Sequence, residues 1–299
     1  MKKYIKYLFL IVAHLLILVL INNNLFAQDS STVMAPNLKV KPVKNTFESV
    51  WLMDNQTVMV PIKGTLEFDI QHRFGTVNNG VKDLYGLFAP SNIRLGINYA
   101  PIKNLFAGIG ITKERMQFDI NAKYAILKQA PKKTPVSVTY FTNMVIDCRD
   151  KSNFTYNAHR FSYFNQLIVA RKINKKFSAE ASTSFSWFNN IEGYVNSKGE
   201  ISNKMNNGHL AFSLLGRYKV SAKSAVILGY DQPLTQHPTN NPHPNICFGF
   251  ETNTSSHAFQ VFAGNYGNIV PQSNNMFNQN DFTKSQYVIG FNITRLWNF

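Results

Sequence analysis

The sequence predicts an all-β protein, an antiparallel up-and-down transmembrane β-barrel of about 12 strands, within a range of roughly 10 to 14. Three observations predict this class. From Thr65 onward, short segments alternate apolar and polar side chains, and the connections between them are short and long in turn. The chain also begins with the features of an export signal. Strands with one apolar and one polar face are what a barrel wall between lipid and water requires.

Residues 1–27 have the pattern of a secretory signal peptide. Three lysines among the first six residues precede an apolar run, Tyr7 to Ile21, and cleavage is expected between Ala27 and Gln28. A membrane anchor is the alternative, but this run is shorter than the roughly 20 residues with which a helix crosses a bilayer. The mean hydropathy of −0.17 also argues against a helical membrane protein. We therefore expect an exported chain that crosses the membrane with strands.

Residues 28–63 are expected to form a periplasmic N-terminal lead-in. The segment is polar and irregular, and Pro36, Pro42 and Pro61 interrupt regular structure. One short strand is expected near Phe47 to Met53. The barrel is expected to occupy residues 64–299.

The barrel strands are predicted from side-chain alternation with a period of two residues. In the first segment, Leu66 and Phe68 lie on one face and Glu67 and Asp69 on the other. Phe161–Ala170 interrupts the alternation, which predicts a β-bulge there. The predicted strands are Thr65–Phe74, Asn92–Tyr99, Leu105–Thr112, Met116–Leu127, Val136–Ile146, Phe161–Ala170, Phe177–Phe188, Leu210–Val220, Ala225–Tyr230, Ile246–Glu251, Ala258–Ala263 and Tyr287–Phe299.

The last predicted strand ends the chain on an aromatic residue, Phe299. Its alternation, with Ile289 and Phe291 on the apolar face, resembles the last strand of bacterial outer-membrane barrels, which the barrel-assembly machinery recognises. This strand is expected to close the barrel by pairing with the strand that begins near Thr65. Arg295 is the one charge on its apolar face and is expected at the periplasmic rim.

The connections support a meandering barrel, in which short turns gather at one end and long loops at the other. A Greek-key sandwich is not expected to sort its loops in this way, and only the 113–115 connection departs from the pattern. With both termini on the short-turn side, the short connections face the periplasm and can meet anionic outer-membrane lipids. No nucleic-acid partner is expected, because the basic residues are dispersed over separate turns. They are Lys103, Lys128, Lys132, Lys133, Arg171, Lys172, Lys175, Lys176 and Lys223.

Charged side chains of both signs lie on the polar strand faces that would line the lumen. Opposed acidic and basic walls constrict a pore, so a porin-like passage for small polar solutes is the leading hypothesis. The alternative is that the charges pair and block the lumen. That would favour a closed barrel with a structural or surface-binding role through the Asn-rich loops 189–209 and 264–286. The pore-lining candidates are Glu67, Asp69, Arg73, Arg94, Asp119, Lys123, Glu180, Arg217 and Glu251, of which the first six are the candidates for the constriction.

The sequence offers little support for catalysis, a cofactor or a metal. It contains no nucleophile elbow, zinc-protease, phosphate-loop or haem motif. His237 and His243 share one Pro-rich loop, but two ligands do not make a metal site. Cys148 and Cys247 are expected to lie across the barrel from each other, without a disulfide. A remote alternative is a lipid-modifying enzyme with a Ser–His pair on the outer wall, for which His72 is the candidate histidine.

Two segments carry a family resemblance. The run Phe68–Gly75, which reads FDIQHRFG, followed by Ile93–Tyr99, which reads IRLGINY, resembles an uncharacterised family of outer-membrane β-barrels from Bacteroidota. That family is described only as a domain of unknown function, and the similarity would cover about residues 46–299. The resemblance implies a barrel in the outer membrane. It implies no substrate or catalytic residue, so the site candidates rest on side-chain parity and charge alone.

Overall fold

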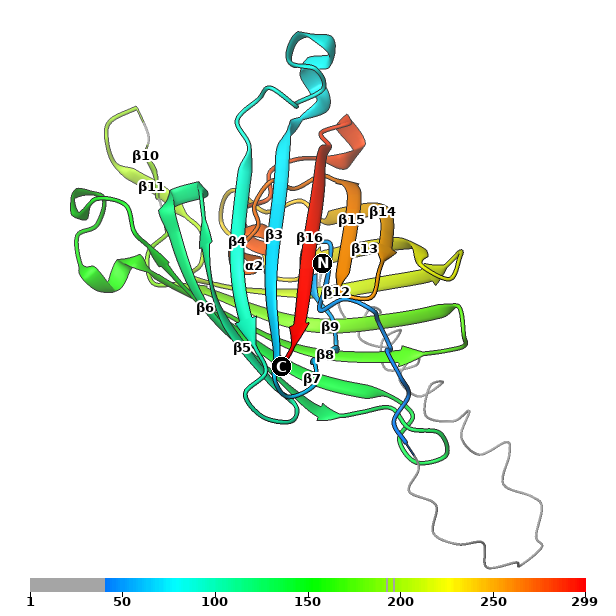
Figure 1. Cartoon of the computed structure of the whole chain (residues 1–299). Coiled ribbons are helices and arrows are strands. Elements are labelled where there is room, and N and C mark those ends of the chain that lie inside the picture. The colour runs from blue at the N-terminus through cyan, green and yellow to red at the C-terminus, as the bar shows by residue number, and fades with distance from the viewer. Residues whose placement is uncertain (1–40, 192, 196) are drawn as a thin grey trace, which may run out of the picture.

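The alternating segments form twelve antiparallel strands that close into a barrel in the computed structural model, which describes residues 41–191, 193–195 and 197–299 (Figure 1). The predicted signal peptide and its cleavage site lie outside the described residues. All twelve predicted strands are present within a few residues of the expected bounds. They are β3 (Thr65–Thr76), β4 (Asn92–Tyr99), β5 (Leu105–Thr112), β6 (Gln117–Leu127), β7 (Ser137–Asp147), β8 (Phe161–Lys172), β9 (Phe177–Phe188), β12 (Gly208–Lys219), β13 (Ser224–Pro233), β14 (Asn245–Asn253), β15 (His257–Gly264) and β16 (Val288–Asn298).

The chain closes on itself through β16 and β3. Asn298 pairs with Thr65 and Ile293 with Ile70, as the alternation of the last strand predicts. This pairing shifts register between Val288 and Gly290, where the last strand enters the wall. The expected bulge in β8 is wrong, because β8 keeps a continuous register with both β7 and β9.

Side chains alternate between the two faces of the wall, and burial follows the alternation. In β6, Asp119 and Lys123 point inward and are buried, whereas Ile120 and Tyr124 point outward and are 44% and 48% exposed. A wall with exposed apolar side chains outside and buried polar ones inside is the pattern of a barrel in lipid. No helix within the described ranges is long and apolar enough to cross a membrane.

The two ends of the barrel differ in their connections. The short-turn rim carries tight connections such as 173–176 between β8 and β9, together with the C-terminal end of β16. The long-loop rim carries loop 77–91, which projects above the wall in Figure 1, and loop 189–207, which contains the hairpin of β10 (Gly193–Val195) and β11 (Ile201–Lys204). The connections are therefore sorted by length as the sequence predicts.

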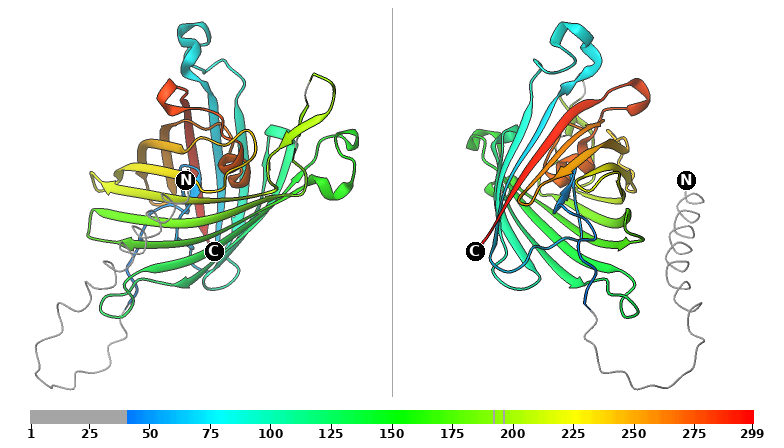
Figure 2. Two further views of the ribbon diagram at one scale, coloured as in Figure 1. Left: turned by 180° about the vertical axis from the view of Figure 1, so that it is seen from behind. Right: turned by 45° about the vertical axis from the view of Figure 1, so that its right-hand side comes forward.

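Residues 46–60, which we call the plug, lie inside the barrel. They include the two-residue strands β1 (Trp51–Leu52) and β2 (Asn55–Gln56), which pair as a small hairpin. Apart from Glu48 and Met59, every plug residue is buried. The right-hand view of Figure 2 shows this dark blue segment within the ring of strands. The plug belongs to the segment 28–63 expected as a lead-in, of which residues 41–63 are described.

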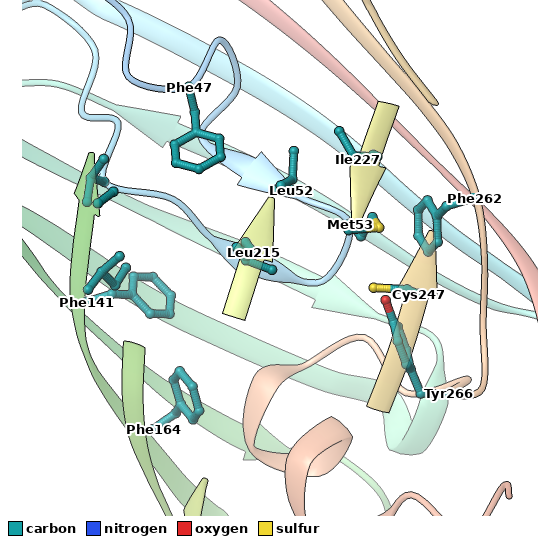
Figure 3. Packing of buried hydrophobic residues seen from close by; sticks show 13 residues of the cluster. Phe47, Leu52, Met53, Phe141, Phe164, Leu215, Ile227, Cys247, Phe262 and Tyr266 are labelled. Atoms are coloured by element: carbon teal, nitrogen blue, oxygen red, sulfur yellow. The ribbon is translucent and has the colours of Figure 1, made fainter. Parts of the chain in front are cut away.

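The largest apolar cluster is formed between the plug and one side of the wall, and a smaller one joins Val50, Trp51 and Val60 to β5 and β6. Phe47, Leu52, Met53 and Val58 of the plug pack on inward side chains of the wall. Figure 3 shows Phe47, Leu52 and Met53 next to wall residues of this cluster. The wall residues of this cluster are Phe141, Phe164, Ile168, Ala170, Leu215, Ile227, Cys247 and Phe262, with Tyr266 from the connection after β15.

A second segment enters the lumen from the long-loop rim. Residues 265–287, which we call the inward loop, connect β15 to β16 and contain helix α2 (Pro271–Phe277). Helix α2 contacts β8, β9, β12 and β13, so the loop crosses the lumen to the opposite wall. Its residues from Pro271 to Met276 are all buried. The plug and the inward loop together fill the interior that the strands enclose.

Candidate functional site in the barrel lumen

The nine charged residues predicted to face the lumen all point into the barrel and are buried. Lys123, Glu180 and Glu251 contact the plug directly. The exposed fractions are 0% for Glu67, 1% for Asp69, 0% for Arg73, 2% for Arg94, 1% for Asp119, 1% for Lys123, 3% for Glu180, 6% for Arg217 and 0% for Glu251.

Arg94 on β4 joins two carboxylates, Asp69 on the adjacent strand β3 and Asp119 on β6, one strand beyond β5. Its Nη1 donates to Asp69 Oδ1 at 2.8 Å, and its Nε and Nη2 donate to the two oxygens of Asp119 at 2.8 and 2.9 Å. A side chain at Gly96 or Gly110 would collide with this group, since an added Cβ would lie 2.2 Å from Asp69 Oδ2 or 2.3 Å from Arg94 Nη2. Two glycines therefore leave room for a buried ion-pair triad in the wall.

Lys123 holds the plug by its backbone. Its ammonium Nζ donates to the carbonyl oxygens of Val50 at 3.2 Å, Thr57 at 3.0 Å and Met59 at 3.2 Å. Nearby on the wall, Glu67 Oε1 accepts a hydrogen bond from Asn98 Nδ2 at 3.3 Å, and Glu67 has no hydrogen bond to the plug within the described residues. One lysine thus satisfies three carbonyls on both arms of the β1–β2 hairpin.

Two carboxylates on the far side of the barrel bind the other face of the plug. Glu251 accepts from Arg217 Nε at 2.5 Å and from the Ser49 hydroxyl at 2.5 Å. Glu180 accepts from the backbone N–H of Val58 at 3.1 Å. Wall charges from opposite sides of the lumen therefore meet the same short segment.

Arg73 lies apart from the other predicted constriction residues. Its Nη1 donates to Asn292 Oδ1 at 3.0 Å, its Nη2 donates to the Met53 carbonyl at 3.4 Å, and its guanidinium stacks on the Phe262 ring at 4.6 Å. The structure brings Asp69, Arg94 and Asp119 into one cluster. It assigns Arg73 to the tip of the plug instead.

The tip of the plug meets the inward loop at Asp54, a residue the sequence analysis does not single out. Asp54 accepts a hydrogen bond from the Tyr266 hydroxyl at 2.6 Å and another from Asn274 Nδ2 on α2. Next to it, Asn55 Nδ2 donates to Asp231 Oδ1 at 3.0 Å. The segments that enter from the two rims are therefore joined in the middle of the lumen.

The sequence of the wall strands contains an indication that a plug fills the lumen. The interior of a water-filled barrel is polar, so large apolar side chains are not expected on its inner face. Four such side chains nevertheless point inward and are at most 3% exposed: Phe141, Phe164, Ile168 and Phe262. The apolar inward residues of β8 are also what interrupts its alternation. They match apolar plug residues such as Leu52, so the irregular strand marks the wall that contacts the plug.

The structure does not bring His237 and His243 together as a pair of metal ligands. His237 lies against His209, with His209 Nδ1 and His237 Nε2 at 2.9 Å, and not against His243. His237 Nδ1 accepts from the Asn206 backbone N–H, so its Nε2 carries the proton and donates to His209. No group of three or more His, Cys, Asp or Glu residues within the described ranges is arranged to hold a metal ion.

Two histidines bear on the predicted Ser–His pair of a lipid-modifying enzyme. His72 points outward and stacks on Phe291, with ring centroids 5.0 Å apart. Ser256 Oγ and His257 Nδ1 are 3.2 Å apart in the tight turn before β15.

The two cysteines are free thiols in different environments. Cys148 is exposed directly after β7, and Cys247 is buried on the inner face of β14. Cys247 is 2% exposed and belongs to the cluster of Met53 and Tyr266, as Figure 3 shows. The reactivity of the Cys247 thiol therefore depends on whether the plug is in place.

Comparisons with known proteins agree with the architecture. A family model described as "Membrane bound beta barrel domain (DUF5777)" matches residues 47–297, so its first matched residue lies in the plug. No curated protein matches the chain. Several solved structures match with low sequence identity and TM-scores below 0.5.

Three of these solved structures are a NanC porin, an outer membrane channel from Pseudomonas putida F1 and a KdgM porin. The NanC porin has 10% identity and a TM-score of 0.48, over 78% of this chain and 99% of that chain. The Pseudomonas channel has 10% identity and a TM-score of 0.46, over 80% of this chain and 97% of that chain. The KdgM porin has 7% identity and a TM-score of 0.42, over 79% of this chain and 99% of that chain.

Proposed function

This chain belongs to the family of membrane-bound β-barrel domains, DUF5777, and on that premise we propose that it is an outer-membrane channel for small polar solutes that rests closed. The observation that carries the proposal is that a separate segment, and not the wall itself, occupies a charged lumen. The wall is complete without that segment, because each of its twelve strands is hydrogen-bonded to two neighbours. Removal of the plug would therefore leave a closed ring of strands around the charged wall residues, the apolar wall residues that had contacted the plug, and the inward loop.

The plug enters and leaves at the same rim. On its N-terminal side, Lys172 Nζ donates to the Lys44 and Asn45 carbonyls at 3.1 and 3.0 Å. On its C-terminal side, the Gly64 backbone N–H donates to the Ala100 carbonyl at 2.8 Å. These anchors lie at the short-turn rim, so residues 46–60 form a loop that can withdraw without threading through the barrel.

The lumen would keep its charge after withdrawal. Arg94 stays paired with Asp69 and Asp119, and Arg217 stays paired with Glu251, because all five side chains belong to the wall. Lys123 and Glu180 would exchange plug backbone groups for water. Charged groups of both signs would then line the path, which favours polar solutes and opposes apolar ones.

The second candidate is a permanently closed barrel that acts through its long loops. The observation in its favour is the apolar contact between plug and wall, in which Phe47, Leu52 and Met53 are each 0% exposed. Withdrawal would expose these side chains, at a cost of roughly 1.5–3 kcal/mol for each large apolar side chain. An opening plug must therefore be captured by a partner or by another surface outside the lumen.

A planar-bilayer recording separates the two candidates. The full-length mature chain and a variant that lacks residues 46–60 are refolded and recorded under the same conditions. We expect brief, rare openings from the full-length chain and a steady conductance from the deletion variant. Circular dichroism and the heat-dependent gel mobility of folded barrels control for folding. A folded deletion variant that conducts no more than the full-length chain would refute the channel and leave the closed barrel.

A further inference from the structure

A cavity of about 390 Å³ lies at the long-loop rim, outside the lumen site. It is bounded by the ends of β6 to β9, by loop 147–160 and by the C-terminal end of α2. Its volume is within the range of small-molecule sites, about 300–1,000 Å³. The residues that decide its chemistry are Arg115, Asp147, Arg149, Arg160, Phe188 and Phe277.

The cavity has a strongly basic side. Arg115, Arg149 and Arg160 line it, and Asp147 is the one carboxylate among its described lining residues. Asp147 is already bound to Arg149, whose Nη2 lies 2.8 Å from Asp147 Oδ2. The described lining therefore contains three guanidinium groups and one carboxylate.

Arg160 is held in a fixed orientation by the protein. Its Nη1 donates to the carbonyl oxygens of Asp147 at 2.8 Å and Arg149 at 2.7 Å. Its guanidinium also stacks on the Phe154 ring, with the central carbon 4.4 Å from the ring centroid. Neither Nε nor Nη2 of Arg160 has a hydrogen-bond partner among the described residues. A guanidinium that is already immobilised loses little entropy when it binds a ligand.

Another part of the cavity lining is apolar and aromatic. Phe277, the last residue of α2, packs edge-on against Phe188 with ring centroids 4.8 Å apart. Ile191 packs on the same cluster, which includes Met205 and Met276. The Arg115 guanidinium lies 5.9 Å from the Phe277 ring centroid, where the basic and apolar sides meet.

We propose that this cavity binds a small organic anion, a carboxylate or a phosphate ester that carries an apolar body. The charged group would be bound by the free edge of the Arg160 guanidinium, because a guanidinium offers two parallel donors to either anion. The apolar body would contact Phe188 and Phe277. The site exists in the closed barrel, so binding does not depend on the proposed channel opening.

Isothermal titration of the full mature chain in detergent tests this site. The probes are benzoate and phenyl phosphate, with the neutral benzamide as the matched control for charge. We expect at least one anion to bind and benzamide to bind at least about tenfold more weakly, since a hydrogen bond to a charged group contributes about 1.5–3 kcal/mol. Binding of only one anion identifies the charged group of the ligand class.

Three variants test which residues are responsible. Arg160→Gln is expected to weaken anion binding by about tenfold or more, and Arg115→Gln, on a different connection, is expected to weaken it as well. Lys151→Gln removes one charge from the same loop as Arg160 but does not line the cavity, and it should leave affinity within about twofold. Equal binding of benzamide and benzoate, equal losses in all three variants, or no binding of either anion to the full-length chain would overturn the proposal.

Discussion

Lys123→Met is the substitution that loosens the plug most directly. Methionine has a similar length and remains compatible with a buried position, but it cannot donate hydrogen bonds. The three carbonyls of Val50, Thr57 and Met59 lose the ammonium that binds them. The wall pairing of β6 is unchanged, because it depends on backbone groups. The substitution therefore separates the stability of the plug from that of the barrel.

The size of the effect follows from what remains bound. The Val50 carbonyl keeps the backbone N–H of Thr57 at 2.8 Å. The carbonyls of Thr57 and Met59 have no other hydrogen-bond donor among the described residues. Leaving a buried polar group unsatisfied costs about 1–3 kcal/mol, so the plug loses about that much at the Thr57 carbonyl and less at the part-buried Met59 carbonyl. Relief from burying an ammonium offsets part of this loss. A net change of about 2 kcal/mol would raise the open population by roughly 30-fold.

The assay is the open fraction in planar bilayers, compared between the full-length chain, Lys123→Met and Lys175→Met. Lys175 is exposed in the turn between β8 and β9, so its substitution is a matched control that removes one charge outside the lumen. We expect a large increase in open fraction for Lys123→Met and none for Lys175→Met. If folded Lys123→Met opens as rarely as the full-length chain, the contacts of Lys123 do not hold a gate.

Three further substitutions or conditions have defined outcomes. Arg94→Ala is expected to lower the free energy of unfolding in urea by about 3–5 kcal/mol, because it leaves two buried carboxylates unpaired. Lys284→Ala is the control at an exposed ion pair and should change this free energy by less than about 1 kcal/mol. Asp54→Asn removes the charge that accepts from Tyr266 and α2, and should speed hydrogen exchange in α2 by about tenfold. Burial lowers the pKa of His237, so the unfolded chain binds the proton more tightly and stability should fall as pH drops below about 6.5. Unfolding at pH 7.5 and 5 measures this loss, which His237→Gln should reduce.

Each of these results can also go against the structure. Equal destabilisation by Arg94→Ala and Lys284→Ala would mean that the triad in the wall is not buried as described. Unchanged exchange in α2 after Asp54→Asn would separate the plug from the inward loop. A pH dependence that persists in full after His237→Gln would assign it to another group.

The wall was predictable because its determinants are local. A period of two fixes which side chains share a face, and burial of one face fixes the register. Asn92–Tyr99, Leu105–Thr112 and Phe177–Phe188 were located to the residue, and the pairing of the last strand with Thr65 follows from the closure that a membrane barrel requires.

The contents of the lumen were not predictable in the same way. Residues 46–60 have no strand periodicity, and their backbone groups bind side chains such as Lys123, Glu180 and Gln260, which lie on different strands. The parity of Glu67 and Arg94 places them inside the barrel but does not indicate whether water or protein surrounds them. Helix α2 likewise depends on tertiary contacts, since seven residues are too few to form a stable helix alone.

The native Cys247 gives the most direct test that the plug fills the lumen of the resting barrel. In a Cys148→Ser background, Cys247 is the single thiol, and Met53 and Tyr266 cover it. A membrane-impermeant maleimide is applied to the folded barrel with and without residues 46–60. We predict slow labelling of Cys247 when the plug is present and rapid labelling when it is deleted. Equally rapid labelling of both proteins would contradict a closed lumen.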